Sequence, residues 1–89
     1  MDVDGWRGRI DRIDDDILEL IARRAVISGR IGRVKIKSGL PIDDHDRERA
    51  ILDRLAVINK GPLSDDSIRR IFGLIIREIK DNNQIDKEL

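Results

Sequence analysis

The stretch WRGRIDRIDDDILELIARRAVISGRIGRV, residues 6–34, decides the fold class of this chain of 89 residues. Its apolar side chains recur in steps of three and four, which is the spacing of one face of an α-helix. They are Trp6, Ile10, Ile13, Ile17, Leu20, Ile27, Ile31 and Val34. Asp4 is a suitable N-cap, no proline follows before Ser38, and Gly39 with Pro41 provides a stop signal. The pattern predicts one helix of about 32 residues.

Two shorter helices are predicted downstream. The first covers about residues 44–59 and ends at the breaker Lys-Gly-Pro, residues 60–62. The second begins after Ser64, the expected N-cap, with Asp65 and Asp66 in its first turn. No segment alternates with the period of a strand. The sequence therefore predicts an all-α fold with three helices per chain.

The composition excludes several classes of protein. Acidic and basic residues balance to a net charge of zero, which argues against general binding to nucleic acid or membranes. There is no cysteine and only one histidine, so disulfides are excluded and a zinc site is not expected. No cofactor is expected, and a reducing cytoplasm is the predicted location. The two aromatic residues, Trp6 and Phe72, are expected in the core.

The length of the first helix bears on assembly. A helix of 32 residues is roughly 48 Å long, whereas a single compact domain over residues 1–89 has a radius of gyration of about 12 Å. Two shorter helices cannot cover so long an apolar face, so we expect a homodimer with paired long helices. The alternative is a monomer in which the helix bends near Gly29 and Gly32. Each glycine costs a helix roughly 1 kcal/mol relative to alanine, so close packing is expected there.

Charged residues interrupt the apolar faces of the first two helices. Arg24 stands where the 4-3 pattern calls for an apolar residue, and Lys35, eleven residues later, lies about 20° away around the helix. On the second helix Asp44, Arg47 and Glu48 extend the apolar face. One interpretation is a salt-bridged network that pairs the two cations of the first helix with the two acids of the second. The other is a polar pocket within a helical bundle for a small anionic ligand that carries hydroxyl groups.

In these residues the chain resembles the all-α chorismate mutases of the AroQ class. The resemblance rests on RGRIDRIDDDILELIARR (7–24), GRVKIKSGLPIDDHDRER (32–49) and KGPLSDDSIRRIF (60–72). It implies an intertwined homodimer with two shared active sites that converts chorismate to prephenate, on the route to phenylalanine and tyrosine. A pericyclic rearrangement of this kind needs neither a nucleophile nor a cofactor.

The resemblance also implies roles for individual residues. Arg24 and Arg47 resemble the arginines that bind the substrate carboxylates, and Arg7 resembles the arginine that reaches into the partner chain's site. Lys35 resembles the lysine that donates a hydrogen bond to the ether oxygen of the breaking bond. These side chains would act by holding a compact conformer and by stabilising the negative charge that develops on that oxygen.

The remaining positions include one departure from the family. Asp44 and Glu48 resemble the residues that hold the substrate hydroxyl. A glutamine or glutamate of the last helix normally pairs with the lysine, but the matching position, counted from Phe72, is Asn83. Gln84 follows one residue later, about 100° further around the helix. The sequence leaves open which of these two residues takes the place of the family's glutamine.

Two other functions remain in competition with the mutase. An isochorismate-pyruvate lyase shares the fold and much of the pocket, although Lys35 and the D-x-x-R-E-R element of residues 44–49 favour the mutase. A helical dimerisation or regulatory module that lost catalysis is the second, and its support is the departure at Asn83. No fused partner domain is expected in 89 residues.

Overall fold

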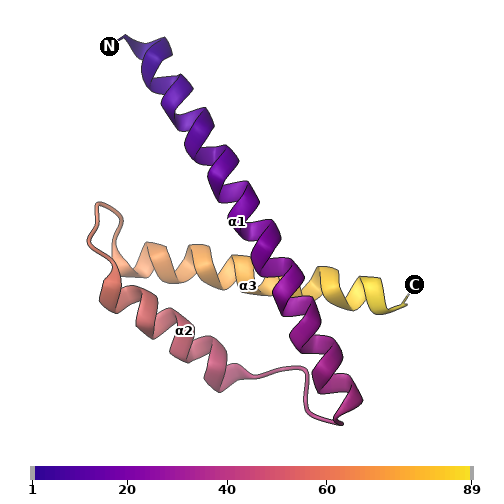
Figure 1. The fold of residues 1–89 in the computed structure, drawn as a ribbon. Coiled ribbons are helices and arrows are strands. Elements are labelled where there is room, and N and C mark those ends of the chain that lie inside the picture. Colours follow the sequence, from indigo (N-terminus) through magenta and orange to yellow (C-terminus); the bar gives the residue numbers. More distant parts are fainter. Residues whose placement is uncertain (1, 89) are drawn as a thin grey trace.

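The computed structural model describes the backbone of residues 2–88 and the side chains of residues 2–83. The helices are α1 (Val3–Lys37), α2 (His45–Ile58) and α3 (Asp65–Glu88), and no strand occurs over the described backbone (Figure 1). The prediction of an all-α chain with one long and two shorter helices is confirmed. No helix among the described residues is long and apolar enough to cross a membrane.

The N-cap of the long helix α1 lies two residues earlier than predicted. Asp2 is the N-cap, and its Oδ1 accepts a hydrogen bond from the backbone N–H of Gly5 at 2.8 Å. The assignment of this role to Asp4 is wrong, because Asp2 precedes it with an extended backbone that places its side chain over the first turn. At the other end Ser38 is the C-cap and Gly39 follows with φ of 70°, as the predicted stop signal requires.

The shorter helices begin close to their predicted starts: α3 follows the predicted cap Ser64, and α2 is capped by Asp44, for which no cap had been predicted. Oδ1 of Asp44 accepts a hydrogen bond from the backbone N–H of Arg47 at 3.0 Å, which starts α2. Oγ of Ser64 accepts one from the backbone N–H of Ser67 at 3.1 Å, which starts α3. Asp44 therefore has a structural role at the end of a helix, besides any role in binding.

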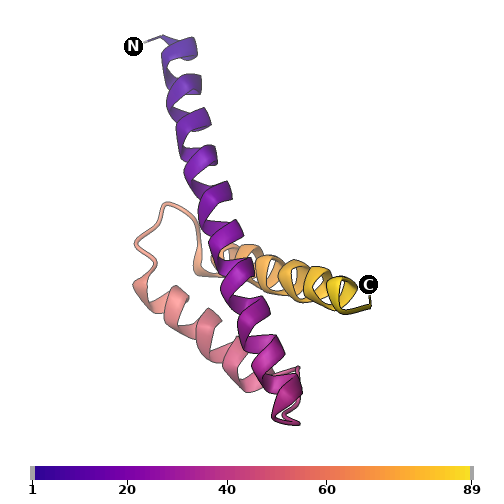
Figure 2. The ribbon, with the colours of Figure 1, turned by 45° about the vertical axis from the view of Figure 1, so that its right-hand side comes forward.

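The three helices form an open arrangement in which α2 lies beside α3 and α1 crosses α3 (Figures 1 and 2). Gly29 is buried where α1 meets α3, and a Cβ atom added there would lie 3.4 Å from Oδ1 of Asn83. Close packing at this glycine is confirmed. Since α1 is one continuous helix, the alternative of a bend near Gly29 and Gly32 is wrong.

The N-terminal half of α1 extends away from α2 and α3, and its apolar face is uncovered (Figure 1). We call this face the α1 stripe; it consists of Trp6, Ile10, Ile13, Ile17 and Leu20, and each of these residues is about half exposed. The prediction that Trp6 lies in the core is wrong for this chain, because 52% of its surface is exposed, and the Arg9 guanidinium lies 5.0 Å from its ring centre. The radius of gyration, 16.2 Å, exceeds the value of about 12 Å for a compact domain of this length.

Candidate active site

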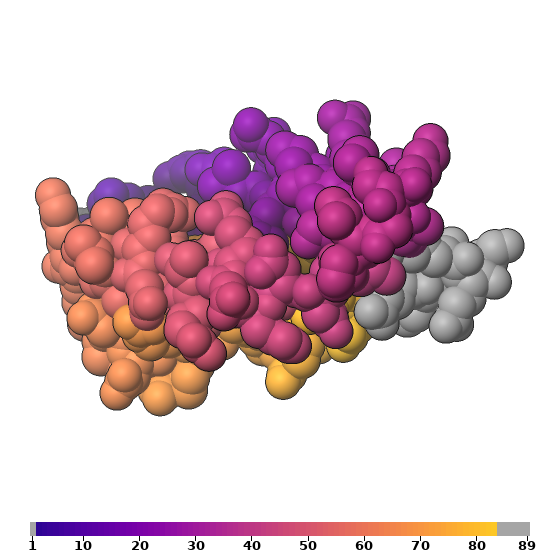
Figure 3. All heavy atoms as spheres, turned by 90° about the horizontal axis from the view of Figure 1, so that it is seen from below, coloured from indigo at the N-terminus to yellow at the C-terminus, as the bar shows by residue number. Residues whose placement is uncertain are grey.

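A cavity of about 210 Å³ lies where the C-terminal half of α1, the start of α2 and the C-terminal half of α3 come together. Figure 3 looks onto the side of the molecule where α2 and the end of α1 lie side by side with α3. The cavity walls combine apolar side chains with an unusual number of charged ones. The lining residues are Arg24, Ser28, Ile31, Gly32, Lys35, Ile42, Asp44, Arg47, Glu48, Ile51, Ile76, Ile79, Lys80 and Asn83.

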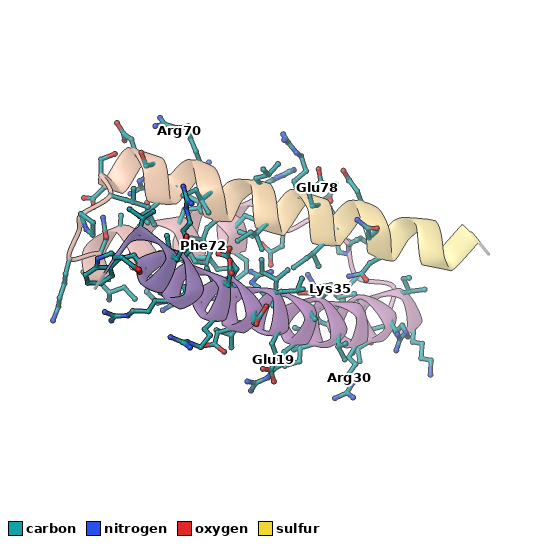
Figure 4. The ribbon with its side chains drawn as sticks, turned by 90° about the horizontal axis from the view of Figure 1, so that it is seen from above. Glu19, Arg30, Lys35, Arg70, Phe72 and Glu78 are labelled. Atoms are coloured by element: carbon teal, nitrogen blue, oxygen red, sulfur yellow. The ribbon has the colours of Figure 1, made fainter. Side chains whose placement is uncertain are left out.

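The helices bring the predicted site residues together, with one exception. Arg24, Lys35, Asp44, Arg47, Glu48 and Asn83 all line the cavity, whereas Arg7 does not. Lys35 lies on the side of α1 that faces α3, while Glu19 and Arg30 point away from it (Figure 4). The spacing of eleven residues that placed the two cations of α1 on one face is thus realised in the structure.

Arg7 lies near the opposite end of α1 from the cavity. The seventeen residues between Arg7 and Arg24 correspond to about 26 Å of helix, which is far beyond the reach of an arginine side chain. Arg7 Nη1 lies 3.7 Å from Oδ1 of Asp4, and its side chain is 73% exposed. This arginine therefore cannot take part in the cavity of its own chain.

The inward orientation of the charged residues is only partly as predicted. Arg24, Lys35 and Glu48 are half-buried, but Asp44 and Arg47 are exposed in the single chain. Both residues stand at the N-terminal end of α2, Asp44 as its cap and Arg47 in its first turn. Asp44 and Arg47 thus lie on the predicted face of α2 and line the cavity, but they are not shielded from water in the single chain.

One acid of the cavity, Glu48, and the neighbouring Asp43 pair with a cation that the sequence analysis did not identify. Lys80 Nζ lies 2.8 Å from Oε1 of Glu48 and 3.1 Å from Oδ1 of Asp43. Within residues 2–83, neither Arg24 nor Lys35 forms an ion pair, so the predicted network between these two cations and the acids of α2 is wrong in its partners. The sequence held a signal for Lys80, because two steps of four residues from Phe72 lead through Ile76 to this position on the face of α3 that lines the cavity.

The cavity carries an excess of positive charge. Four cations line it, Arg24, Lys35, Arg47 and Lys80, against the two carboxylates of Asp44 and Glu48. In the part of the chain with described side chains, the first three of these cations form no ion pair, so their N–H groups are available to a ligand. An excess of two positive charges complements a ligand with two carboxylates, which arginine binds through paired hydrogen bonds.

The ion pairs of Lys80 displace two pKa values. Hydrogen bonds to Glu48 and then Asp43 raise the pKa of Lys80 above its usual value, although partial burial opposes the shift. The hydrogen bond from Lys80, together with its positive charge, lowers the pKa of Asp43 below its usual value. Both shifts favour the charged forms, so the link between α3 and the α1–α2 connection persists through the neutral range of pH.

A pH dependence of stability follows from these shifts. The contribution of Asp43 is present above its ordinary pKa of 3.8 and is lost as the pH falls through the lower value in the folded state. The contribution of Lys80 is present below its ordinary pKa of 10.5 and is lost as the pH rises through the higher folded value. We expect the difference in urea midpoint between wild type and Lys80→Met to be constant from about pH 5 to 9 and to shrink outside that range. A difference that persists at pH 2 would contradict this account, and Lys60→Met, at an exposed position, is the control.

Comparison with known proteins bears directly on this cavity. A family model described as "Chorismate mutase type II" matches residues 6–84, which include every cavity residue. The chain belongs to the chorismate mutase type II family. The resemblance identified from the sequence is thereby confirmed, and so is the all-α fold class.

Relatives and solved structures agree with this assignment. The chorismate mutase of Methanocaldococcus jannaschii is 37% identical over 75 residues, which are 83% of this chain and 76% of the relative. A bifunctional chorismate mutase/prephenate dehydratase of Aquifex aeolicus is 46% identical over 54 residues, which are 61% of this chain and 15% of the relative. This chain therefore spans only a fraction of the bifunctional relatives. A solved chorismate mutase from Thermus thermophilus has a TM-score of 0.90 at 33% identity, covering 92% of this chain and 93% of the other.

Proposed function

We propose that this chain catalyses the rearrangement of chorismate to prephenate. The observation that carries the proposal is the cavity itself, in which α1, α2 and α3 gather four cations around two carboxylates in a chain of the chorismate mutase type II family. Chorismate carries two carboxylates, an ether oxygen and a hydroxyl group. The excess of two positive charges matches the charge of this substrate, and the carboxylates of the wall can accept a hydrogen bond from its hydroxyl.

Binding and charge stabilisation account for the chemistry. Arg24 and Arg47 bind the substrate carboxylates and hold the molecule in the compact conformer from which the rearrangement proceeds. Lys35 donates a hydrogen bond to the ether oxygen, which gains negative charge as its bond to carbon breaks. This lysine is half-buried on the side of α1 that faces α3, and apolar neighbours such as Ile76 and Ile79 strengthen its field by excluding water.

The remaining cavity residues orient the substrate. Glu48 and Asp44 hold its hydroxyl group, which donates its one proton to one carboxylate at a time. Oδ1 of Asp44 already caps α2, so Oδ2 is the oxygen of this residue that can take part. Asn83 lines the cavity beside the α1–α3 crossing, and we assign to it the contact at the ether oxygen that the family's glutamine makes. The side chain of Gln84, the alternative, lies outside the described residues.

The working unit that we propose is a homodimer of single-domain chains, residues 1–89, in the cytoplasm. A second copy would cover the α1 stripe, which is too apolar and too extended to remain in water. Because Arg7 lies about 26 Å along α1 from Arg24, antiparallel pairing of two α1 helices carries it toward the other chain's cavity. In this arrangement Arg7 of the partner subunit completes each active site.

A direct assay tests the reaction. Purified protein is incubated with chorismate and the product is identified by NMR, beside the variants Arg24→Ala and Arg23→Ala. We expect prephenate from wild type and from Arg23→Ala, whose side chain is exposed, and essentially none from Arg24→Ala. Unchanged chorismate with wild type would reject the proposal in favour of a non-catalytic module. Pyruvate released from isochorismate would instead identify the lyase.

Mixing two inactive variants tests whether the active sites are shared. Arg7→Ala and Arg24→Ala are purified separately, mixed, unfolded and refolded together. Random pairing gives about half heterodimers, each with one intact site, so about a quarter of wild-type activity should return. Each variant refolded alone is the control and should stay inactive. No recovery in the mixture would show that Arg7 and Arg24 do not serve the same site from different chains.

A further inference from the structure

From its position on α3, Lys80 contacts one other residue of the cavity wall, Glu48, and one residue of the connection before α2, Asp43. Its Nζ lies 2.8 Å from Oε1 of Glu48 on α2 and 3.1 Å from Oδ1 of Asp43 on the α1–α2 connection. The Lys80 and Glu48 side chains are 25% and 28% exposed, so this pair is better shielded from water than an ordinary surface ion pair. A charged hydrogen bond between partly buried groups fixes both side chains more firmly than an exposed pair would.

We propose that Lys80 is a positioning residue of the active site, which holds Glu48 by one oxygen so that the other can accept a hydrogen bond from the substrate. This inference rests on the proposed function. Among the described side chains, the ion-pair partner of Glu48 Oε2 is Nδ1 of His45, at 3.6 Å, which is too long for a hydrogen bond. His45 is itself largely exposed and easily displaced. The carboxylate is thus anchored on one side and accessible on the other.

The other cations of the cavity make such an anchor necessary. Glu48 shares the wall with Arg24, Lys35 and Arg47, and a carboxylate that turned freely could pair with any of them. Such a pair would neutralise a cation that the substrate needs. By engaging Oε1, Lys80 keeps Glu48 on the α3 side and leaves the remaining cations free.

The second contact of Lys80 extends its effect to the chain before α2. Asp43 directly precedes Asp44, and Ile42 and Asp44 both line the cavity. The link between Lys80 and Asp43 therefore fixes the connection that carries this part of the wall. Because substrate binding through the hydroxyl is the same before and during the reaction, loss of Lys80 should raise KM more than it lowers kcat.

Steady-state kinetics with a double-mutant cycle test this role. The variants are Lys80→Met, Lys80→Arg, Glu48→Gln and the combination of Lys80→Met with Glu48→Gln, with Lys60→Met as the surface control. We expect Lys80→Met to lower kcat/KM about tenfold or more, mainly through KM, because a half-buried carboxylate loses its partner. Lys80→Arg should recover activity to within about threefold. Lys80→Met should cost clearly less once Glu48 is already glutamine, because only the contact with Asp43 is then left to lose.

Three outcomes would overturn the inference. A Lys80→Met variant within about twofold of wild type would show that Glu48 needs no anchor. An equal loss in the Glu48→Gln background would show that Lys80 acts independently of Glu48, for instance by binding the substrate directly. A wild-type protein that yields no prephenate would reject both the proposed function and this inference. If the wild type is active and either of the first two outcomes is found, only the role of Lys80 is rejected. If Lys80→Met does not fold, as judged by thermal unfolding, Lys80→Gln replaces it in the cycle.

Discussion

Replacing Lys35 by alanine is expected to lower kcat by about 100- to 1000-fold, the usual cost of removing a donor from a developing negative charge. The ammonium of Lys35 has no ion-pair partner within the described part of the chain, so its full charge is available to the ether oxygen. The cavity wall also contains apolar side chains, which limit the access of water that could replace the lysine. KM should change far less than kcat, because the contact strengthens only as the bond to oxygen breaks.

Lys37→Ala provides the matched control, since it removes an exposed lysine from the last turn of the same helix. Its kinetics should be close to those of wild type. Saturation curves for chorismate consumption, with circular dichroism to confirm folding, separate the two parameters. A kcat within about tenfold of wild type for Lys35→Ala would reject its assigned role, and a loss confined to KM would reassign Lys35 to ground-state binding.

The second large effect is expected from Ile13→Lys, at the centre of the α1 stripe. Ile13 is 55% exposed in the single chain and would be buried in the proposed homodimer. In a dimer with twofold symmetry, both chains carry the substitution at the same interface. Burying two unpaired lysine ammonium groups close together is strongly unfavourable. Light scattering should give about 20 kDa for wild type and the single-chain mass of 10.2 kDa for the variant. The circular-dichroism signal of the helices and the rate of prephenate formation should both be lower in the variant than in wild type.

Asp15→Lys is the control for this substitution. It places the same side chain on α1 about 160° away from the α1 stripe, where it meets solvent. This variant should keep the wild-type mass and activity. A wild type that is monomeric at micromolar concentration would contradict the dimer itself, and an unaffected Ile13→Lys dimer would place the interface elsewhere.

Helical periodicity and end signals predicted most of the fold, because both depend on local chemistry. The predicted cap at Ser64 and the predicted stop at Gly39 each act on backbone groups within a few residues. The start of α1 was misplaced because two suitable aspartates, Asp2 and Asp4, stand close together and the backbone geometry decides between them.

The site was predictable wherever charge interrupted an apolar row. Arg24 and Lys35 were found in this way, and Lys80 follows the same rule on α3. Lys80 is harder to recognise from the sequence, because it directly follows Ile79, an apolar residue that already fits the helical pattern. The cation that pairs with Glu48 could not be derived from the sequence. Whether it is Lys80 or a cation of α1 depends on how α3 packs against α2.

Trp6 gives the protein an optical property of its own. It is the only tryptophan, there is no tyrosine, and it stands in the α1 stripe with half of its surface in water. Indole emission therefore arises from a single chromophore at the surface where a second copy is proposed to bind. Dilution, refolding and subunit exchange can be followed by intrinsic fluorescence, without a dye that would perturb so small a protein.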